Sequence, residues 1–126
     1  MPPDGRDTAY LLDMLESARR VREHTAHRTF AEYGADWLLR SAVERALEVI
    51  GEAARHVSAE LRVAHPEIPW REIVGQRNIL AHDYGSILND RIWIVVEDRL
   101  PDLIEQLEKL VPEPPEDPMG EGGKDA

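Results

Sequence analysis

The stretch of sequence that decides the fold is residues 36–61, DWLLRSAVERALEVIGEAARHVSAEL. Its apolar residues recur in alternating steps of four and three positions, at Leu39, Val43, Ala46, Ile50, Ala53 and Val57. This spacing is typical of an α-helix that packs lengthwise against another helix. Gly51, in the middle of this stretch, lowers the stability of the helix by about 1 kcal/mol relative to alanine. We therefore predict one long helix in which Gly51 allows a neighbouring helix to approach closely.

The flanking sequence repeats the helical periodicity and has almost no strand pattern. It predicts a first helix from Asp7 to the low twenties, a third from Trp70 to about His82 and a fourth from about Asp90 to Leu110. Pro101 should kink the fourth helix. The expected connections are a turn at residues 29–34, a loop at 65–70 and a helix stop at Gly85 and Ser86. We predict an all-α, antiparallel four-helix bundle of the kind that short connections favour.

The chain has 126 residues and is 42% hydrophobic, which suits one domain with its own core. We expect an N-terminal extension at residues 1–6, a helical domain at 7–111 and a disordered tail at 112–126. The tail is rich in proline, glycine and acidic residues and has no means of burying apolar surface. The three tryptophans, Trp37, Trp70 and Trp93, are expected to be core anchors.

Composition limits the location and the partners of the protein. The chain has no cysteine, no apolar run long enough for a membrane span and no signal-peptide pattern, so we expect a cytoplasmic protein without membrane partners. The net charge of -10 argues against tight binding of nucleic acid. However, bases are concentrated in residues 19–28, so a local basic surface and weak, salt-sensitive binding of RNA stay open.

Residues 77–84, RNILAHDY, contain the side chains that are our candidates for catalysis. At about 100° per residue, Gly75, Asn78 and His82 share one strip of a helix that faces away from the core. Arg77 points toward the apolar side, from where its long side chain can reach solvent. Two arrangements bring Arg77 and His82 together: a helix that loosens near Ala81, or a symmetric dimer that presents two copies of the segment to one cleft. We favour the dimer.

Arginine and histidine suffice to cleave RNA, because RNA supplies its own nucleophile, the 2′-hydroxyl. His82 can exchange protons near neutral pH, and Arg77 can stabilise the charge of the phosphorane. Asn78 can orient the phosphate, and the expected product is a 2′,3′-cyclic phosphate. We expect no metal and no cofactor, since His24 and His27 have ligand spacing without a third ligand.

The order Arg77, four residues, His82, one residue, Tyr84 resembles the RX4HXY signature of HepT proteins in the HEPN superfamily. The resemblance extends over about residues 7–110. It includes sequence segments such as Ile50-Gly51-Glu52-Ala53 and Pro69-Trp70-Arg71-Glu72-Ile73. It implies an endoribonuclease toxin that dimerises with its motifs facing a shared cleft, and some members assemble further. It also implies an antitoxin, a minimal nucleotidyltransferase, that transfers AMP to the motif tyrosine.

Carried onto this chain, the resemblance makes Arg77 and His82 catalytic and Tyr84 the AMP acceptor, with RNA, a second copy and the antitoxin as partners. We assign Gly75, Gly51 and Glu52 to the interface between copies. Other interpretations stay open: Arg77 as a structural arginine paired with Glu48 or Glu52, His82 as a helix-end histidine, Tyr84 as a core residue and Asn78 as a cap. The alternative function is a non-catalytic dimeric module that binds a nucleotidyltransferase.

Overall fold

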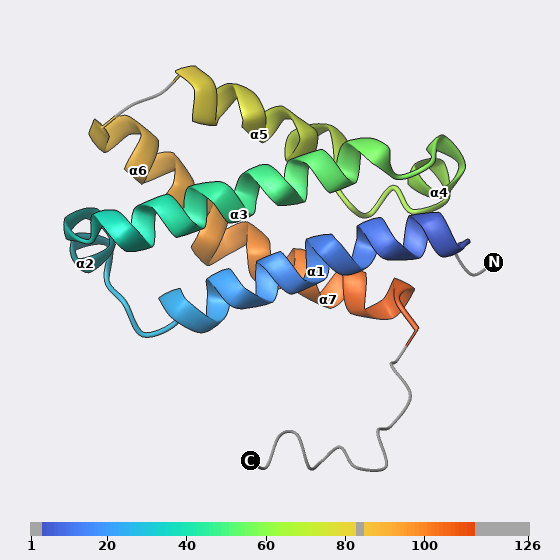
Figure 1. Ribbon diagram of the computed structural model, residues 1–126, viewed down its shortest axis with the longest axis horizontal. Helices are drawn as coiled ribbons and strands as arrows, with labels where there is room; N and C mark the ends of the chain where they lie inside the picture. The colour runs from blue at the N-terminus through green and yellow to red at the C-terminus, as the bar shows by residue number, and fades with distance from the viewer. Residues whose placement is uncertain (1–3, 83–84, 113–126) are drawn as a thin grey trace, which may run out of the picture.

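The computed structural model describes residues 4–82 and 85–112, and in this part of the chain every regular element is helical. Figure 1 shows α1, α3, α5 and the segment from α6 to α7 running lengthwise with alternating directions. The predicted all-α bundle is confirmed. The elements are α1 (Gly5–Thr25), α2 (Phe30–Ala35), α3 (Trp37–His56), α4 (Ala59–Ala64), α5 (Trp70–His82), α6 (Gly85–Ile94), the π-helical turn η1 (Val95–Arg99) and α7 (Leu100–Leu110).

Helix α3 lies between α1 and α5, and it packs along both of them. The predicted seam is buried at Val43, Ile50, Ala53 and Val57, and it is half-buried at Leu39 and Ala46. Helix α7 covers the other side of α1, so the core is a continuous apolar layer between four lengthwise helical segments. Burial of these faces, rather than helix propensity, supplies most of the stability of such a bundle.

The predicted long helix at residues 36–61 is wrong in its last turn, because the chain breaks between α3 and α4. Val57 and Ser58 are extended, and the Ser58 hydroxyl accepts a hydrogen bond from the Leu61 backbone nitrogen at 3.2 Å. The carboxylate of Asp7 in α1 accepts two bonds from Ser58, from the backbone nitrogen at 2.8 Å and from the hydroxyl at 2.7 Å. A tertiary contact therefore outweighs local helix continuation at this serine.

The predicted turn at residues 29–34 is also wrong, because residues 30–35 form the short helix α2. Thr29 and Glu32 make a reciprocal capping box, in which each side chain accepts a hydrogen bond from the backbone of the other. This pair satisfies two backbone donors at the start of the helix. The spacing Thr-x-x-Glu is visible in the sequence and is the pattern that indicates this helix.

The C-terminal helical segment begins at Gly85, earlier than the predicted start at Asp90. Gly85 has a φ of +59°, a conformation that glycine adopts without steric cost. A π-helical turn, η1, ends at Arg99, and Pro101 lies in the first turn of α7. The kink at Pro101 stays a prediction. Proline has no N–H to give to the preceding turn, so the hydrogen-bond ladder is interrupted there.

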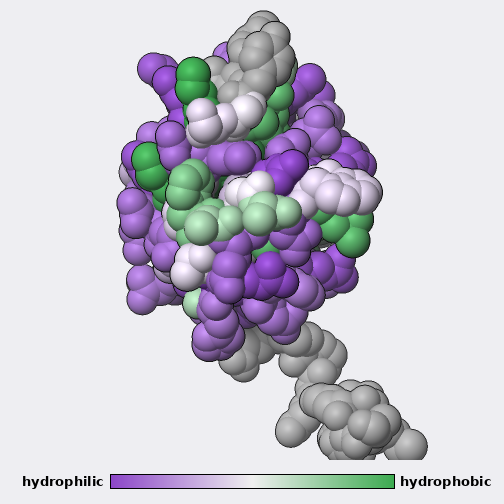
Figure 2. Space-filling view, turned by 90° about the vertical axis from the view of Figure 1, so that its left-hand side faces the viewer, coloured by the Kyte–Doolittle hydropathy of each residue, from purple (hydrophilic) through white to green (hydrophobic). Residues whose placement is uncertain are grey.

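The three tryptophans differ in their surroundings. Trp70 is buried and donates from Nε1 to the carbonyl of His65 at 2.9 Å, and Trp93 packs against Tyr33 with ring centroids 5.2 Å apart. The prediction that Trp37 anchors the core is wrong, because its relative exposure is 67%. Trp37 is the first residue of α3, at the end of the bundle, where Leu38 and Ile87 are exposed too. Figure 2 looks onto this end and shows apolar patches among hydrophilic side chains.

Two further predictions concern the ends of the chain and membranes. The first helix starts at Gly5, and Asp4 caps it by accepting a hydrogen bond from the Asp7 backbone nitrogen at 2.8 Å. Except for Pro112, the predicted tail at 112–126 lies outside the described residues. Within the described ranges, no helix has the length and apolar character needed to cross a bilayer.

We predict that Asp7→Ala lowers the free energy of unfolding by about 3 kcal/mol, because it removes two hydrogen bonds from a buried carboxylate and leaves the Ser58 donors without their acceptor. Urea unfolding followed by circular dichroism measures this change. The matched control is Glu16→Ala on the exposed face of the same helix, which should stay within about 0.5 kcal/mol of the parent. Equal effects of the two substitutions would contradict the role given to Asp7.

Candidate functional site

Gly51 sets the distance between α3 and α5. A Cβ atom at Gly51 would lie 3.2 Å from the carbonyl oxygen of Ile73 and 3.9 Å from Cγ of Arg77. The close approach expected at this glycine is therefore present, and the approaching helix belongs to the same chain. The assignment of Gly51 to an interface between copies stays a prediction.

The orientation of α5 agrees with the helical wheel drawn from the sequence. Ile73 and Gln76 are buried, whereas Asn78 is exposed. Gly75 is half-buried, and a Cβ atom there would meet no other atom within 4 Å. His82 is the last residue of α5. The side chain of His82, together with Asp83 and Tyr84, lies outside the described residues.

Arg77 leaves the apolar side of α5 and reaches across to α3. Its Nη1 lies 3.7 Å from Oε1 of Glu52, and its side chain is 57% exposed. Of the two acidic partners considered for a structural arginine, Glu52 is the one that it meets. An exposed pair at this distance contributes little to stability. The guanidinium can therefore turn to a ligand at small cost.

Glu52 lies within 4 Å of Arg55, His56 and Arg77, and Arg55 is its closest partner. Arg55 donates to Oε2 of Glu52 at 2.8 Å, and Nδ1 of His56 lies 3.7 Å from the same oxygen. The hydrogen bond from Arg55 is the main cause that lowers the pKa of Glu52, and the charges of Arg55, His56 and Arg77 lower it further. Glu52 therefore stays ionised and paired with Arg55 when Arg77 moves away.

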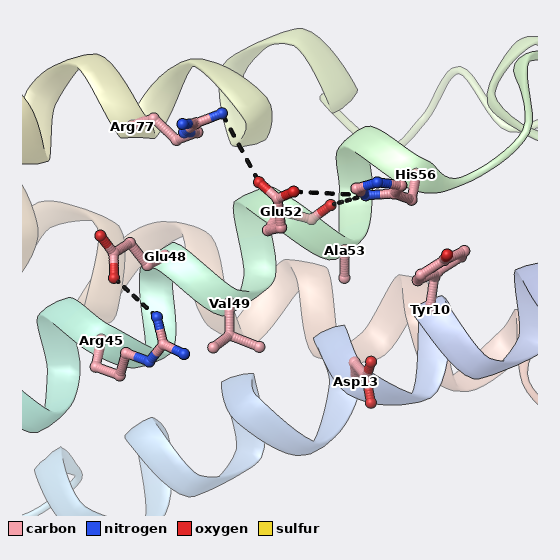
Figure 3. A pocket seen from close by; sticks show the side chains of 9 residues that line it. All are labelled: Tyr10, Asp13, Arg45, Glu48, Val49, Glu52, Ala53, His56 and Arg77. Atoms are coloured by element: carbon pink, nitrogen blue, oxygen red, sulfur yellow. Dashed lines mark hydrogen bonds and ion pairs between the residues drawn. The ribbon is translucent and has the colours of Figure 1, made fainter.

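Two adjoining grooves meet at Arg77. The first, called here the motif groove, has a volume of about 460 Å³ and lies along α5 at Gly75, Arg77, Asn78 and Ala81, with Glu48 of α3 opposite. The second, called the side groove, has a volume of about 420 Å³ and lies between α1, α3 and α5 (Figure 3). Arg77 and Glu48 line both grooves.

The side groove contains residues for which the sequence predicted no role in a functional site. They are Tyr10 and Asp13 of α1 and Arg45, Val49, Ala53 and His56 of α3. In Figure 3, Arg77 extends from α5 toward Glu52, and the rings of Tyr10 and His56 lie side by side at the other end of the groove. Residues far apart in sequence, without a common motif, form this surface, so only the packing of α1 on α3 reveals it.

The basic residues at 19–28 do not form a free cationic surface. Three of the four arginines in this stretch are paired with acids: Arg19 with Glu108 at 2.7 Å, Arg22 with Glu97 at 3.1 Å and Arg28 with Asp36 at 3.2 Å. Their charge is largely balanced within the chain. In the described part of the structure, no group of three or more histidines and acidic residues is arranged to hold a metal ion.

Residues 14–110 match the family described as Ribonuclease HepT-like. The match begins in the middle of α1 and continues to the end of α7. The chain belongs to this family. The HepT-like chain is 41% identical over 100 residues to a protein of Methanocaldococcus jannaschii named "Putative RNase MJ1380", covering 79% of this chain and 92% of the relative. It is 37% identical over 101 residues to the "Probable ribonuclease HepT" of Thermococcus cleftensis, covering 80% and 92%. No solved structure gives a significant match.

We predict opposite effects for alanine at two helix-interior glycines. Gly51→Ala should lower the free energy of unfolding by about 1 kcal/mol, since crowding against the Ile73 carbonyl outweighs the gain in helix propensity. Gly75→Ala should raise it by up to about 1 kcal/mol, because the added methyl group meets open space. Urea unfolding measures both. Stabilisation of similar size by the two substitutions would show that α3 and α5 do not meet closely at Gly51.

Proposed function

We propose that this HepT-like protein is a metal-independent endoribonuclease toxin that acts in the cytoplasm. The observation that carries the proposal is the state of Arg77. Arg77, His82 and Tyr84 of this chain match the RX4HXY pattern. Arg77 lies exposed in a groove, and among the described residues its ion-pair partner is Glu52, at 3.7 Å. A guanidinium that is always charged and weakly held is suited to bind a phosphate oxygen.

In the proposed reaction, the 2′-hydroxyl of the substrate attacks the adjacent phosphorus atom. The bond from phosphorus to the 5′-oxygen of the next nucleotide breaks, and a 2′,3′-cyclic phosphate and a 5′-hydroxyl form. His82 moves the proton that the 2′-hydroxyl loses or that the 5′-oxygen gains. Arg77 stabilises the added negative charge of the phosphorane, and the exposed Asn78 beside it orients the phosphate.

A second copy would complete the site. In a symmetric dimer, the strip of α5 with the half-buried Gly75 and the exposed Asn78 would face the same strip of the partner, and the two His82 residues would share one cleft. Gly75 suits such a contact, because the space above its Cα is open in one chain. Gly51 and Glu52 remain our further candidates for this interface.

The same surface is our candidate for regulation. A nucleotidyltransferase antitoxin that transfers AMP to Tyr84 would place a bulky anion two residues from His82. The added phosphate would oppose an RNA phosphate by charge and by volume. The alternative function, a non-catalytic module that docks a nucleotidyltransferase, uses these residues only as a binding surface.

We predict that the dimer, shown by intact mass to carry no AMP, cleaves RNA in excess EDTA and leaves cyclic phosphate ends. His82→Ala and Arg77→Ala should each lower kcat/KM by at least about 100-fold, the lower range for loss of a proton-transfer group or of a charge stabiliser. Arg19→Ala, which removes an exposed arginine paired with Glu108, is the matched control and should keep the parental rate.

Two results would contradict this function. If the unmodified dimer cleaves none of a broad panel of RNAs, the non-catalytic module becomes the better explanation. If cleavage needs an added divalent ion, the metal-independent mechanism is wrong. Circular dichroism and light scattering on each variant separate loss of chemistry from loss of the fold or of the dimer.

A further inference from the structure

The side groove adjoins the position proposed for the scissile phosphate. Arg77 lines both grooves, so a nucleotide whose phosphate contacts Arg77 in the motif groove has the side groove directly beside it. The volume of about 420 Å³ lies within the range of roughly 300–1,000 Å³ common for pockets that bind small organic groups. A neighbouring base of the substrate can therefore enter this groove.

One end of the side groove is an aromatic wall. The rings of Tyr10 and His56 are stacked, with centroids 5.3 Å apart and an angle of 27° between their planes. Nδ1 of His56 donates a hydrogen bond to the backbone carbonyl of Glu52 at 2.9 Å, which fixes the histidine ring. Aromatic and histidine rings are the surfaces on which proteins stack unpaired RNA bases. Val49 and Ala53 supply apolar contact on the floor of the groove.

The polar groups of the side groove are suited to some bases more than to others. Three carboxylates line it, and two are engaged: Glu48 accepts from Arg45 at 3.1 Å, and Glu52 accepts from Arg55 at 2.8 Å. Within the described part of the chain, Asp13 is the carboxylate of this groove for which no partner is present. An ionised carboxylate only accepts hydrogen bonds, so it selects a base edge that offers donors.

Guanine matches these groups better than the other bases. Its Watson–Crick edge offers two adjacent donors, N1–H and the N2 amino group, which a carboxylate can accept with its two oxygens. Its other edge offers the acceptors O6 and N7, to which an arginine fork such as Arg45 can donate. Adenine and cytosine offer one amino donor beside an acceptor, and uracil offers one donor between two acceptors.

We infer that the side groove is a nucleobase subsite that stacks a guanine of the RNA substrate against Tyr10 and His56 and binds its Watson–Crick edge through Asp13. This inference rests on the proposed ribonuclease function for the identity of the ligand, and it adds a specificity that the motif residues alone do not provide. Phosphate contacts at Arg77 are the same for every sequence, whereas base contacts distinguish sequences.

The test uses short uridine oligoribonucleotides that contain one guanosine, adenosine or cytidine, or none. Cleavage in EDTA gives kcat/KM for each, and fluorescence anisotropy of 2′-O-methyl versions, which cannot be cleaved, gives binding without chemistry. We expect the parent protein to prefer the guanosine substrate by about tenfold. Tyr10→Ala should lose about tenfold in binding of this substrate, within the range for loss of one stacked base, while Tyr10→Phe keeps the parental value.

Two further substitutions separate the roles of the polar residues. Asp13→Asn should remove most of the preference for guanosine, whereas Glu16→Gln, the same loss of charge one turn along α1 and outside the groove, should retain it. His56→Phe preserves a ring of similar shape and should keep most of the binding. Loss of cleavage in His56→Phe with normal binding would overturn its stacking role in favour of proton transfer.

The binding and cleavage measurements test the subsite and the ribonuclease proposal separately. A guanosine preference in binding that Tyr10→Ala and Asp13→Asn abolish supports the subsite even if no oligonucleotide is cleaved, and the ribonuclease proposal then fails alone. Cleavage of all substrates at equal rates, unchanged in the Tyr10 and Asp13 variants, overturns the subsite and leaves the ribonuclease proposal standing. A preference for another base that Asp13→Asn does not alter overturns the assignment of guanine.

Discussion

The backbones of α3 and α5 meet at Gly51, where the carbonyl of Ile73 occupies the space that a side chain would need. This contact fixes how far α5 stands from the bundle. Cγ of Arg77 lies beside the same glycine. The contact at Gly51 therefore also fixes the position of the Arg77 side chain. A larger residue would push α5 outward and with it Arg77, Asn78 and Gly75. The motif groove and its junction with the side groove both depend on this one approach of two helices.

At that junction, a strongly acidic chain presents the guanidinium of Arg77. The protein carries a net charge of -10, and three arginines of its basic N-terminal stretch are paired with acids at the N-cap of α3, in η1 and in α7. Arg77 differs, because the acid that it faces already has Arg55 as a closer partner. An acidic protein can thus keep one arginine available for a phosphate without a broad basic patch. Binding through few cations releases few counterions, so affinity for RNA should be modest and selectivity should come from base contacts.

Much of the fold follows from local patterns in the sequence. The three- and four-residue spacing of apolar side chains predicts the long helices, because it places one apolar stripe on each and the stripes must be buried together. The helical wheel of α5 correctly places Ile73 inward and Asn78 outward. Two of the differences between the predicted and the observed helices have different causes. The capping box of Thr29 and Glu32 was present in the sequence but was not recognised, whereas the break at Ser58 depends on Asp7, 51 residues away.

The sequence by itself determined the helical class, the family and the motif that carries the proposed chemistry, since each of these is encoded in residue types at short, fixed spacing. Only the tertiary structure decided which partner Arg77 meets, that Trp37 stands in solvent and that Tyr10, Asp13 and His56 line one groove beside Arg77. These side chains come from separate helices. Their proximity depends on the crossing and the distance of α1, α3 and α5, which are set by packing over the whole core and by the missing side chain at Gly51.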